Sequence, residues 1–367
     1  MEGVEVNFWQ GRRVFITGHS GFKGGWLSLL LRHLGAVVKG YALEPEIEQS
    51  IFHAAQLDSQ IESVFADIND LDRLKAEIRG FAPEIIFHLA AQPLVRCAYQ
   101  DPVGTYRTNV MGTVHLLEAM RGCSSLRAAV VVTTDKCYEN REWSWPYREI
   151  DSLGGYDPYS SSKACAELVV SAWRNSFFAP SEYHRHGVAL ASARAGNVIG
   201  GGDWSSDRLI PDLVRAFGAG QTASIRNPLA TRPWQHVLEA LRGYLMLGEK
   251  LITAGTAFGE AWNFGPDSCD NQPVEWIAEE VARLWGDRAS WQLAAGEHPH
   301  ESQLLGLDCA KASYKLHWRP MLGIEGALRM TAEWYKRFLT GESALQLCQE
   351  QIAEYIERTA PLAPSGN

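Results

Sequence analysis

The chain has 367 residues and a formal net charge of −9 at pH 7. Hydrophobic residues make up 46% of it and charged residues 21%, which are ordinary values for a globular protein and, at this length, predict about two domains. The acidic balance argues against nucleic acid or an anionic membrane surface as a partner.

The cysteines are scattered and lack the Cys-x-x-Cys spacing of many zinc sites. This pattern indicates reduced thiols in a cytoplasmic protein, and we expect neither disulfides nor a bound metal. Residues 1–10 carry glutamates and no long apolar stretch, so they do not resemble a signal peptide. No apolar run approaches the ~18 residues that a membrane-spanning helix requires.

A strand, a glycine-rich loop and a helix follow one another near the amino terminus. Residues 13–17 are a short β-branched and aromatic run, and 26–34 is an apolar helical stretch. Glycines between them let the backbone turn tightly and approach a pyrophosphate at the amino end of the helix. We therefore expect a dinucleotide site formed by the loop residues Gly18, His19, Ser20, Gly21, Phe22, Lys23 and Gly24.

The second strand, expected over 36–43, indicates which dinucleotide is bound. Glu44 and Glu46 follow it, and their carboxylates would repel a 2′-phosphate, so NAD is favoured over NADP. Asp67 and Ile68 follow the third strand. Asp67 either reaches the adenine end of the cofactor or caps the next helix.

The fourth strand, expected over 84–89, leads into Ala90 and Ala91, whose small side chains allow a cofactor to lie close. We interpret His88 as a hydrogen-bonded core histidine. The next strand, expected over 130–134, delivers Thr134, Asp135 and Lys136 at its tip.

The alternation of strands and helices determines the predicted fold class. It is α/β, with a doubly wound parallel Rossmann sheet that binds ligands at the carboxyl ends of its strands. We expect the cofactor domain over residues 1–195, with a returning segment near 235–265. A smaller α/β lobe for the substrate is expected over 196–345, and a terminal helix with a frayed tail over 346–367.

Tyr159 and Lys163 lie four residues apart on an expected helix and therefore point the same way. An ammonium beside a phenol favours the phenolate and lowers the phenol pKa from about 10 toward neutrality. Such a phenol can accept the proton of an alcohol during its oxidation. An ordinary helix face also carries this pair by chance, so the surrounding motifs decide between the two interpretations.

The smaller lobe contains arginines that match the geometry of a diphosphate. Arg208, Arg226 and Arg232 are candidates, and each would otherwise be an ordinary surface arginine. Arg232 is the best placed of the three, because Trp234 beside it suits a nucleotide site.

The glycine loop, the Tyr159 and Lys163 pair, and the segments 88–91, 134–136 and 194–197 occur in one order along the chain. In that order they resemble the extended short-chain dehydrogenase/reductase family, over about residues 10–340. Further segments resemble the members of the family that dehydrate CDP-D-glucose in O-antigen dideoxysugar synthesis: 18–27, 134–138, 200–204 and 300–309.

The resemblance implies a bound NAD that is regenerated within each turnover, and CDP-glucose as the substrate. It implies that Tyr159 takes the O4′ proton of the sugar, that Thr134 bonds the same oxygen, and that Lys163 holds the nicotinamide ribose. Asp135 is implied as the acid for the hydroxyl that leaves C6. Further implied contacts are Leu89, Asn109 and Thr133 with the cofactor, and Gln92, Asn197, His300 and Glu301 with the substrate.

Lys136 departs from the pattern of the related dTDP-glucose dehydratases, which carry a glutamate there to remove the C5 proton. A lysine can act as this base only if its pKa is lowered by several units, and an ionised Asp135 would oppose that. The alternative is a charged Lys136 that stabilises the enolate. We favour Lys136 as the C5 base.

Three alternatives remain from the sequence. One is a dehydratase of the GDP-mannose type. Another is a 4-epimerase of the same fold, against which the Asp135 and Lys136 pair counts. The third is a non-catalytic NAD-binding sensor. The family further implies a homodimer through the helices expected over 105–119 and 159–178, and leaves open its pairing into a tetramer.

Overall fold

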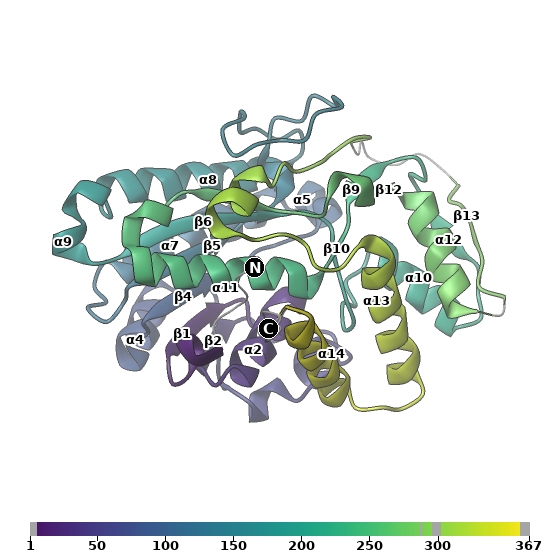
Figure 1. The fold of residues 1–367 in the computed structure, drawn as a ribbon, viewed down its shortest axis with the longest axis horizontal. Helices are drawn as coiled ribbons and strands as arrows, with labels where there is room; N and C mark the ends of the chain where they lie inside the picture. Colours follow the sequence, from purple (N-terminus) through teal and green to yellow (C-terminus); the bar gives the residue numbers. More distant parts are fainter. Residues whose placement is uncertain (1–5, 287, 296–301, 360–367) are drawn as a thin grey trace, which may run out of the picture.

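The computed structural model describes residues 6–286, 288–295 and 302–359. A seven-stranded parallel sheet forms its centre, in the order β11-β6-β5-β4-β1-β2-β3 (Figure 1). This doubly wound order confirms the predicted α/β fold class. The strands are β1 (Arg13–Thr17), β2 (Val37–Ala42), β3 (Glu62–Phe65), β4 (Ile85–His88), β5 (Ala128–Val132), β6 (Ala189–Ala195) and β11 (Ala261–Phe264).

Alternate residues of each strand face opposite sides of the sheet, because the side chains of a strand alternate. Val14 and Ile16 belong to one core, whereas Phe15 between them belongs to another. Helices α2 (Phe22–His33), α11 (Val237–Ala254) and α14 (Ala344–Thr359) contribute to the first core. Helices α4 (Leu71–Phe81), α7 (Gly112–Met120) and α8 (Pro158–Ser176) contribute to the second. The sheet is therefore covered on both faces, which explains the continuous apolar runs of its central strands.

The helix expected over 105–119 is present, but it is not a uniform α-helix. The chain instead forms α6 (Pro102–Tyr106), a π-helical turn at Arg107–Met111 and then α7. Asn109 lies in the π-helical turn, and such turns are frequent at functional sites. The side-chain amide of Asn109 accepts a hydrogen bond from the backbone N–H of Gln92 and donates one to the carbonyl oxygen of Gln92. This turn therefore holds the segment that follows β4.

The strand expected over 130–134 begins and ends two residues earlier, as β5. Thr134 therefore lies beyond the sheet, and its hydroxyl accepts from the backbone N–H of Lys136 at 3.4 Å. A 3-10 turn at Asp135–Cys137 follows and redirects the chain. This turn, rather than strand alternation, sets the directions of the Asp135 and Lys136 side chains.

The smaller lobe lies to the right in Figure 1 and consists of helices with short sheets. Its helices are α10 (Leu209–Gly218), α12 (Val274–Trp285) and α13 (Ile324–Leu339). Its strands are β7 (Val198–Ile199), β8 (Ala223–Ile225), β9 (Thr231–Pro233), β10 (Gln235–His236), β12 (Asn271–Pro273) and β13 (Trp291–Leu293). Helix α11 follows β10 and packs on β5 and β6. The chain then returns to the central sheet at β11.

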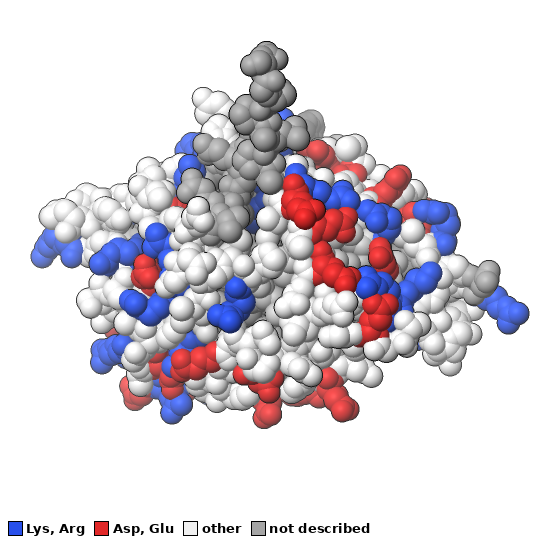
Figure 2. All heavy atoms as spheres, turned by 60° about the horizontal axis from the view of Figure 1, so that its bottom comes forward, with Lys and Arg blue, Asp and Glu red and all other residues white. Residues whose placement is uncertain are grey.

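The molecular surface carries charges of both signs. On the face seen in Figure 2, acidic and basic side chains are interspersed with uncharged surface, unlike a continuous basic nucleic-acid groove. None of the described helices is long and apolar enough to cross a membrane. All seven cysteines are free thiols, as predicted.

Candidate active site

A cavity of about 560 Å³ lies at the carboxyl ends of the central strands. Its wall combines the loops after β1, β3, β4, β5 and β6 with α10 and β8 of the smaller lobe. Parallel strands end at one edge of their sheet, so residues far apart in sequence meet there. The predicted residues that line the cavity are Gly18, Ser20, Gly21, Phe22, Lys23, Gly24, Asp67, Ile68, Leu89, Ala90, Ala91, Thr133, Thr134, Asp135, Lys136, Tyr159, Lys163, Asn197, Arg208, Arg226 and Arg232.

The glycine loop packs too closely against its surroundings to carry side chains at two positions. Gly18 has a φ of +78°, and a Cβ there would lie 2.6 Å from the backbone nitrogen of Ala90. A Cβ on Gly24 would lie 2.0 Å from the carbonyl oxygen of Gly18. Gly21, at the amino end of α2, contributes no side-chain cap to the helix. The first N–H groups of α2 are thus not occupied by a capping side chain, which fits the pyrophosphate of a dinucleotide.

Lys23 extends this loop toward the reacting groups. The pKa of Lys23 is lowered to about 7, mainly by burial and also by the positive charges of Lys163 and Arg208, whereas Asp135 acts in the opposite direction. A lysine with this pKa changes its charge near neutral pH.

Tyr159 and Lys163 lie on α8 and are both buried at the cavity wall. The expectation that Lys163 brings the pKa of Tyr159 toward neutrality is wrong for the protein without its ligands. Burial raises the pKa of Tyr159 to about 12, and its hydrogen bond with Thr134 and the charge of Arg208 oppose this increase. Burial also lowers the pKa of Lys163 to about 8, so the cation itself is weakened, although Glu167 partly restores it.

Asp135 is buried between Thr134 and the smaller lobe. Thr134 donates a hydrogen bond to Oδ1 of Asp135 at 2.9 Å, whereas Oδ2 has no hydrogen-bond partner among the described residues. Burial raises the pKa of Asp135, although Lys136, Thr134 and Arg232 act in the opposite direction. A carboxyl group whose pKa is raised keeps its proton more readily and can donate it to a leaving group.

A buried network beneath the cavity supports these groups, and the sequence predictions missed its centre, Glu167. This carboxylate accepts from Thr133 at 2.5 Å, from Ser192 at 2.8 Å and from Arg194 at 2.7 Å. The three partners and the Arg194 charge hold the pKa of Glu167 below its usual range despite burial. Its position one helical turn after Lys163 is the signal from which it could have been found.

The predicted cofactor residues His19 and Asn109 and the predicted substrate residue Gln92 lie beside the cavity rather than in its wall. The ring of His19 packs in the core against Phe52 and Phe65. Asn109 is buried and also donates to the Ser162 hydroxyl at 2.8 Å. Gln92 donates to the Thr105 hydroxyl at 2.9 Å, so its amide is used within the protein.

Asp67 and His88 had alternative interpretations in the sequence. Asp70, not Asp67, caps α4 by accepting from the backbone N–H of Arg73 at 3.0 Å. Asp67 lines the cavity instead. His88 is buried and lies 2.6 Å from the Thr17 hydroxyl, as expected of a hydrogen-bonded core histidine.

The arginines of the smaller lobe differ in their partners. Arg208 pairs with Asp203 at 2.8 Å, and Arg226 pairs with Asp207 at 2.9 Å. Arg232 donates to the carbonyl oxygens of 302 and 303, and so ties β9 to that segment. His300 and Glu301 lie outside the described residues. Arg96, which the sequence predictions also missed, lines the cavity from the segment after β4.

Comparison with known proteins places this geometry among nucleotide-sugar enzymes. A family model described as GDP-mannose 4,6 dehydratase matches residues 15–331. The CDP-glucose 4,6-dehydratase of Salmonella typhimurium is 53% identical over 356 residues, which cover 97% of this chain and 99% of that protein. The dTDP-glucose 4,6-dehydratase of Haemophilus influenzae is 25% identical, over 88% of this chain and 97% of its own.

Solved structures share the fold at low sequence identity. An epimerase of Methanothermobacter thermautotrophicus superposes with a TM-score of 0.77 at 22% identity, over 95% of this chain and 96% of that one. The dTDP-glucose 4,6-dehydratase of Bacillus anthracis, solved with NAD, superposes with a TM-score of 0.73 at 21% identity, over 89% of this chain and 97% of that one.

Proposed function

Because this chain belongs to the GDP-mannose 4,6 dehydratase family of nucleotide-sugar enzymes, we propose that it converts CDP-D-glucose to CDP-4-keto-6-deoxy-D-glucose and water. The observation that carries the proposal is the 53% identity, over almost the whole chain, to the Salmonella CDP-glucose 4,6-dehydratase. The dTDP-glucose 4,6-dehydratase of Haemophilus influenzae is only 25% identical.

NAD is the cofactor in this proposal. The glycine loop, Asp67, Ile68 and the segment 89–91 surround the space in which it would lie. When bound, NAD would be the oxidant that accepts the C4 hydrogen as a hydride and returns it to C6. The close approach of Gly18 to Ala90 and the uncapped amino end of α2 support this position for the cofactor.

Tyr159, Thr134 and Lys163 act on the C4 hydroxyl. Tyr159 accepts the O4′ proton, and Thr134 holds the same oxygen through its hydroxyl. In the ligand-free state Tyr159 is protonated at neutral pH, since its pKa is about 12. Positive charge on Lys163 and on the oxidised nicotinamide ring lowers the pKa of a phenol, so the filled site favours the reactive phenolate.

Asp135 and Lys136 act on C5 and C6. Oxidation at C4 makes the C5 proton acidic, and Lys136 removes it or, in the alternative, stabilises the enolate as a cation. Asp135 gives its proton to the C6 hydroxyl, which leaves as water. The raised pKa of Asp135 supports its role as the acid.

Substrate contacts come mainly from the smaller lobe. Asn197, Arg208, Arg226 and Arg232 line the same cavity as Tyr159 and hold the nucleotide sugar. Gln92, His300 and Glu301 complete the proposed substrate contacts. We further infer a homodimer that works in the cytoplasm.

The proposal is tested by incubating the purified chain, with NAD, separately with CDP-glucose, UDP-glucose, GDP-mannose and dTDP-glucose. The alkaline absorbance of a 4-keto-6-deoxy sugar should appear with CDP-glucose and be weak or missing with the others. Thermal shifts with CDP, UDP, GDP and dTDP should follow the same order. Turnover of GDP-mannose alone, or epimerisation without water loss, would reject the proposal in favour of the respective alternative.

A further inference from the structure

We propose that Arg96 and Arg226 together bind the diphosphate of the nucleotide sugar, and that the Asp207 carboxylate takes the place of that diphosphate in the ligand-free enzyme. The inference rests on the proposed function only in taking a nucleotide sugar as the ligand. Arg96 and Asp207 were not among the residues that the sequence singles out.

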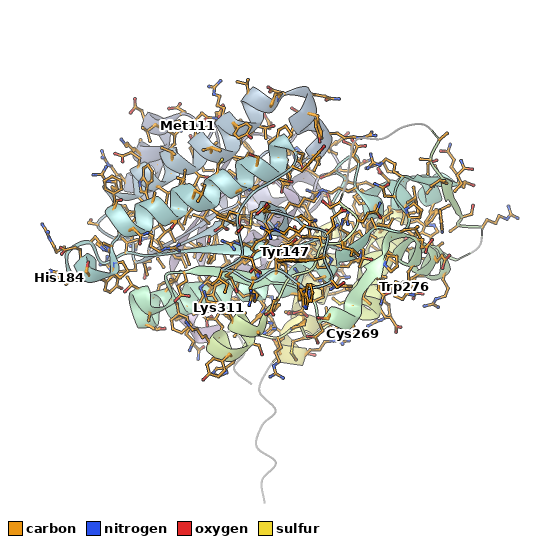
Figure 3. All side chains as sticks on the ribbon, turned by 90° about the horizontal axis from the view of Figure 1, so that it is seen from above. Met111, Tyr147, His184, Cys269, Trp276 and Lys311 are labelled. Carbon is orange, nitrogen blue, oxygen red and sulfur yellow. The ribbon has the colours of Figure 1, made fainter. Side chains whose placement is uncertain are left out.

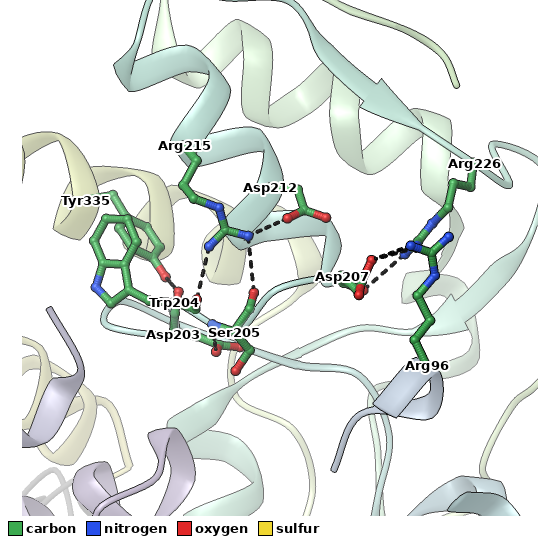
Figure 4. Close-up of polar contacts among 9 residues, drawn as sticks. All are labelled: Arg96, Asp203, Trp204, Ser205, Asp207, Asp212, Arg215, Arg226 and Tyr335. Atoms are coloured by element: carbon green, nitrogen blue, oxygen red, sulfur yellow. Dashed lines mark hydrogen bonds and ion pairs between the residues drawn. The ribbon is translucent and has the colours of Figure 1, made fainter. Parts of the chain in front are cut away.

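The three side chains form one bridge between the two lobes (Figure 4). Nη1 of Arg96 donates to Oδ1 of Asp207 at 3.0 Å, and Nη1 of Arg226 donates to the same oxygen at 2.9 Å. Arg96 belongs to α5 (Val95–Gln100), which follows the segment after β4 in the cofactor lobe. Arg226 directly follows β8 in the smaller lobe. The carboxylate thus joins two cations that the chain brings together from 130 positions apart.

The bridge lies on the wall of the candidate active site. Arg96, Asp207 and Arg226 all line the cavity that also contains Tyr159. Arg208, the next residue after Asp207, is electrostatically coupled to Tyr159. Arg208 therefore faces the reacting groups, and the adjacent Asp207 faces the paired arginines. This spacing suits a ligand in which the reacting sugar is joined directly to a diphosphate.

The charges of the bridge suit a diphosphate better than they suit one carboxylate. Two guanidinium groups around Asp207 leave one positive charge unbalanced, whereas the diphosphate of a nucleotide sugar carries two negative charges. The side chains of Arg96 and Asp207 are 40% and 35% exposed, and ion pairs with such exposure contribute little to stability. Guanidinium groups bind phosphate oxygens in a forked geometry, so exchange of the carboxylate for the diphosphate is favourable.

The backbone of Asp207 is held in an unusual conformation. Its φ is +61°, in the left-handed region that aspartate tolerates better than most residues. In this conformation both its carboxylate and its carbonyl oxygen face Arg226, whose Nη2 donates to the carbonyl at 3.1 Å. The pair of Arg215 with Asp212 in the same view joins neighbouring turns of α10 and does not connect the lobes.

The test measures binding of CDP, cytidine and inorganic pyrophosphate to the full-length chain by calorimetry, with saturating NAD so that the dinucleotide site is filled. Arg96→Gln and Arg226→Gln should each weaken CDP and pyrophosphate about tenfold, the usual effect of one lost charged hydrogen bond, and leave cytidine unchanged. Asp207→Asn should strengthen both phosphate ligands several-fold, because the competing negative charge is gone.

Two further variants make the outcome decisive. Arg283→Gln removes a paired arginine of α12 that is 69% exposed, and it should bind all three probes like the unmodified chain. Asp207→Gly relieves the left-handed backbone and should also strengthen pyrophosphate binding, which guards against a folding defect in Asp207→Asn. Weaker or unchanged pyrophosphate binding in both Asp207 variants, or unmodified binding in both cavity arginine variants, would overturn the inference.

Pyrophosphate separates this inference from the proposed function, because it carries no base and no sugar. If the expected changes occur but CDP-glucose is not converted, the arginine pair stands and the substrate assignment fails. If CDP-glucose is converted but the variants bind pyrophosphate unchanged, the substrate assignment stands and the arginine pair fails.

Discussion

At the carboxyl end of β5, two adjacent side chains have opposite tasks in the proposed elimination. An ionised Asp135 would keep Lys136 charged and so prevent it from acting as a base. Burial raises the pKa of Asp135, however, which favours its uncharged form, and that form does not oppose a neutral Lys136. The structure thereby weakens the main objection to Lys136 as the C5 base.

Lys136→Met should therefore stop deuterium from entering C5 when CDP-glucose is incubated in heavy water, while oxidation at C4 persists. The methionine keeps the length of the side chain but cannot accept a proton. Mass spectrometry of the recovered sugar and the absorbance of the reduced cofactor measure the two steps separately. Lys136→Arg is the matched control, because it restores the charge without a usable base. C5 exchange in either variant at the rate of the unmodified enzyme would exclude the role as base.

NAD binding should depend on pH through Lys23. Its pKa of about 7 means that Lys23 is charged below neutrality and neutral above it. A cation favours the pyrophosphate, so we expect affinity for NAD to fall about twofold to fourfold as the pH rises from about 6 to about 7.5, the most that one group with this pKa allows. Titration of the intrinsic tryptophan fluorescence with NAD measures this directly.

Two variants at position 23 check the assignment. Lys23→Met should bind NAD weakly at every pH in this range, and Lys23→Arg should bind it tightly at every pH, because neither side chain titrates there. If the pH dependence persists in Lys23→Met, another group causes it, and Lys163 with its pKa of about 8 becomes the first candidate.

At the scale of elements, the strand, loop and helix unit at the amino terminus is fixed by close backbone contacts rather than by side chains. Gly24 lies in the first turn of α2, where the helix passes the carbonyl of Gly18, and no other residue fits without moving the loop. The same rule applies to Gly18, where the conformation is left-handed as well. The backbone of the strand, loop and helix unit therefore determines the shape of the dinucleotide site.

Gly24→Ala should lower the free energy of unfolding by about 1–3 kcal/mol or more and abolish NAD binding, because its methyl group meets backbone atoms. Gly80→Ala is the matched control. Gly80 lies in α4, and a methyl group there would have no other atom within 4 Å, so alanine should raise the free energy of unfolding by about 0.5–1 kcal/mol. Urea denaturation of both variants measures the difference. Equal stability of the two would show that the loop adapts to a side chain.

At the scale of the whole molecule, α8 has a buried face at the active site and an apolar outer face. It packs beside α6 and the π-helical turn, where Figure 3 places Met111. Exposed apolar side chains on these elements include Val103 at 77%, Leu168 at 58% and Met111 at 44%. Exposed apolar side chains on neighbouring helical segments are often found at interfaces, which fits the proposed dimer.

Leu168→Glu should convert the proposed dimer to monomers, because it places a charge in the centre of that apolar face. Sedimentation velocity at several concentrations measures the mass. Leu293→Glu, at a site 63% exposed on β13 of the smaller lobe, is the control and should stay dimeric. A monomer before any substitution, or a dimer after Leu168→Glu, would contradict the assignment of the interface to α8.

The sequence by itself determined the fold class and the edge of the sheet at which ligands bind. Apolar strands that alternate with helices admit few arrangements, and β1 was predicted to its exact ends. The glycine loop and Tyr159 with Lys163 were also visible, because their geometry is local: each depends on residues within one turn or one helix.

Only the tertiary structure decided what depends on distant residues. Three features join segments that no local pattern connects. They are the π-helical turn that holds Gln92 through Asn109, the buried Glu167 network, and the bridge of Arg96, Asp207 and Arg226. The charge states were decided in the same way. The pKa of Tyr159 rises rather than falls, because burial by the whole fold outweighs the hydrogen bond with Thr134 and the charge of Arg208.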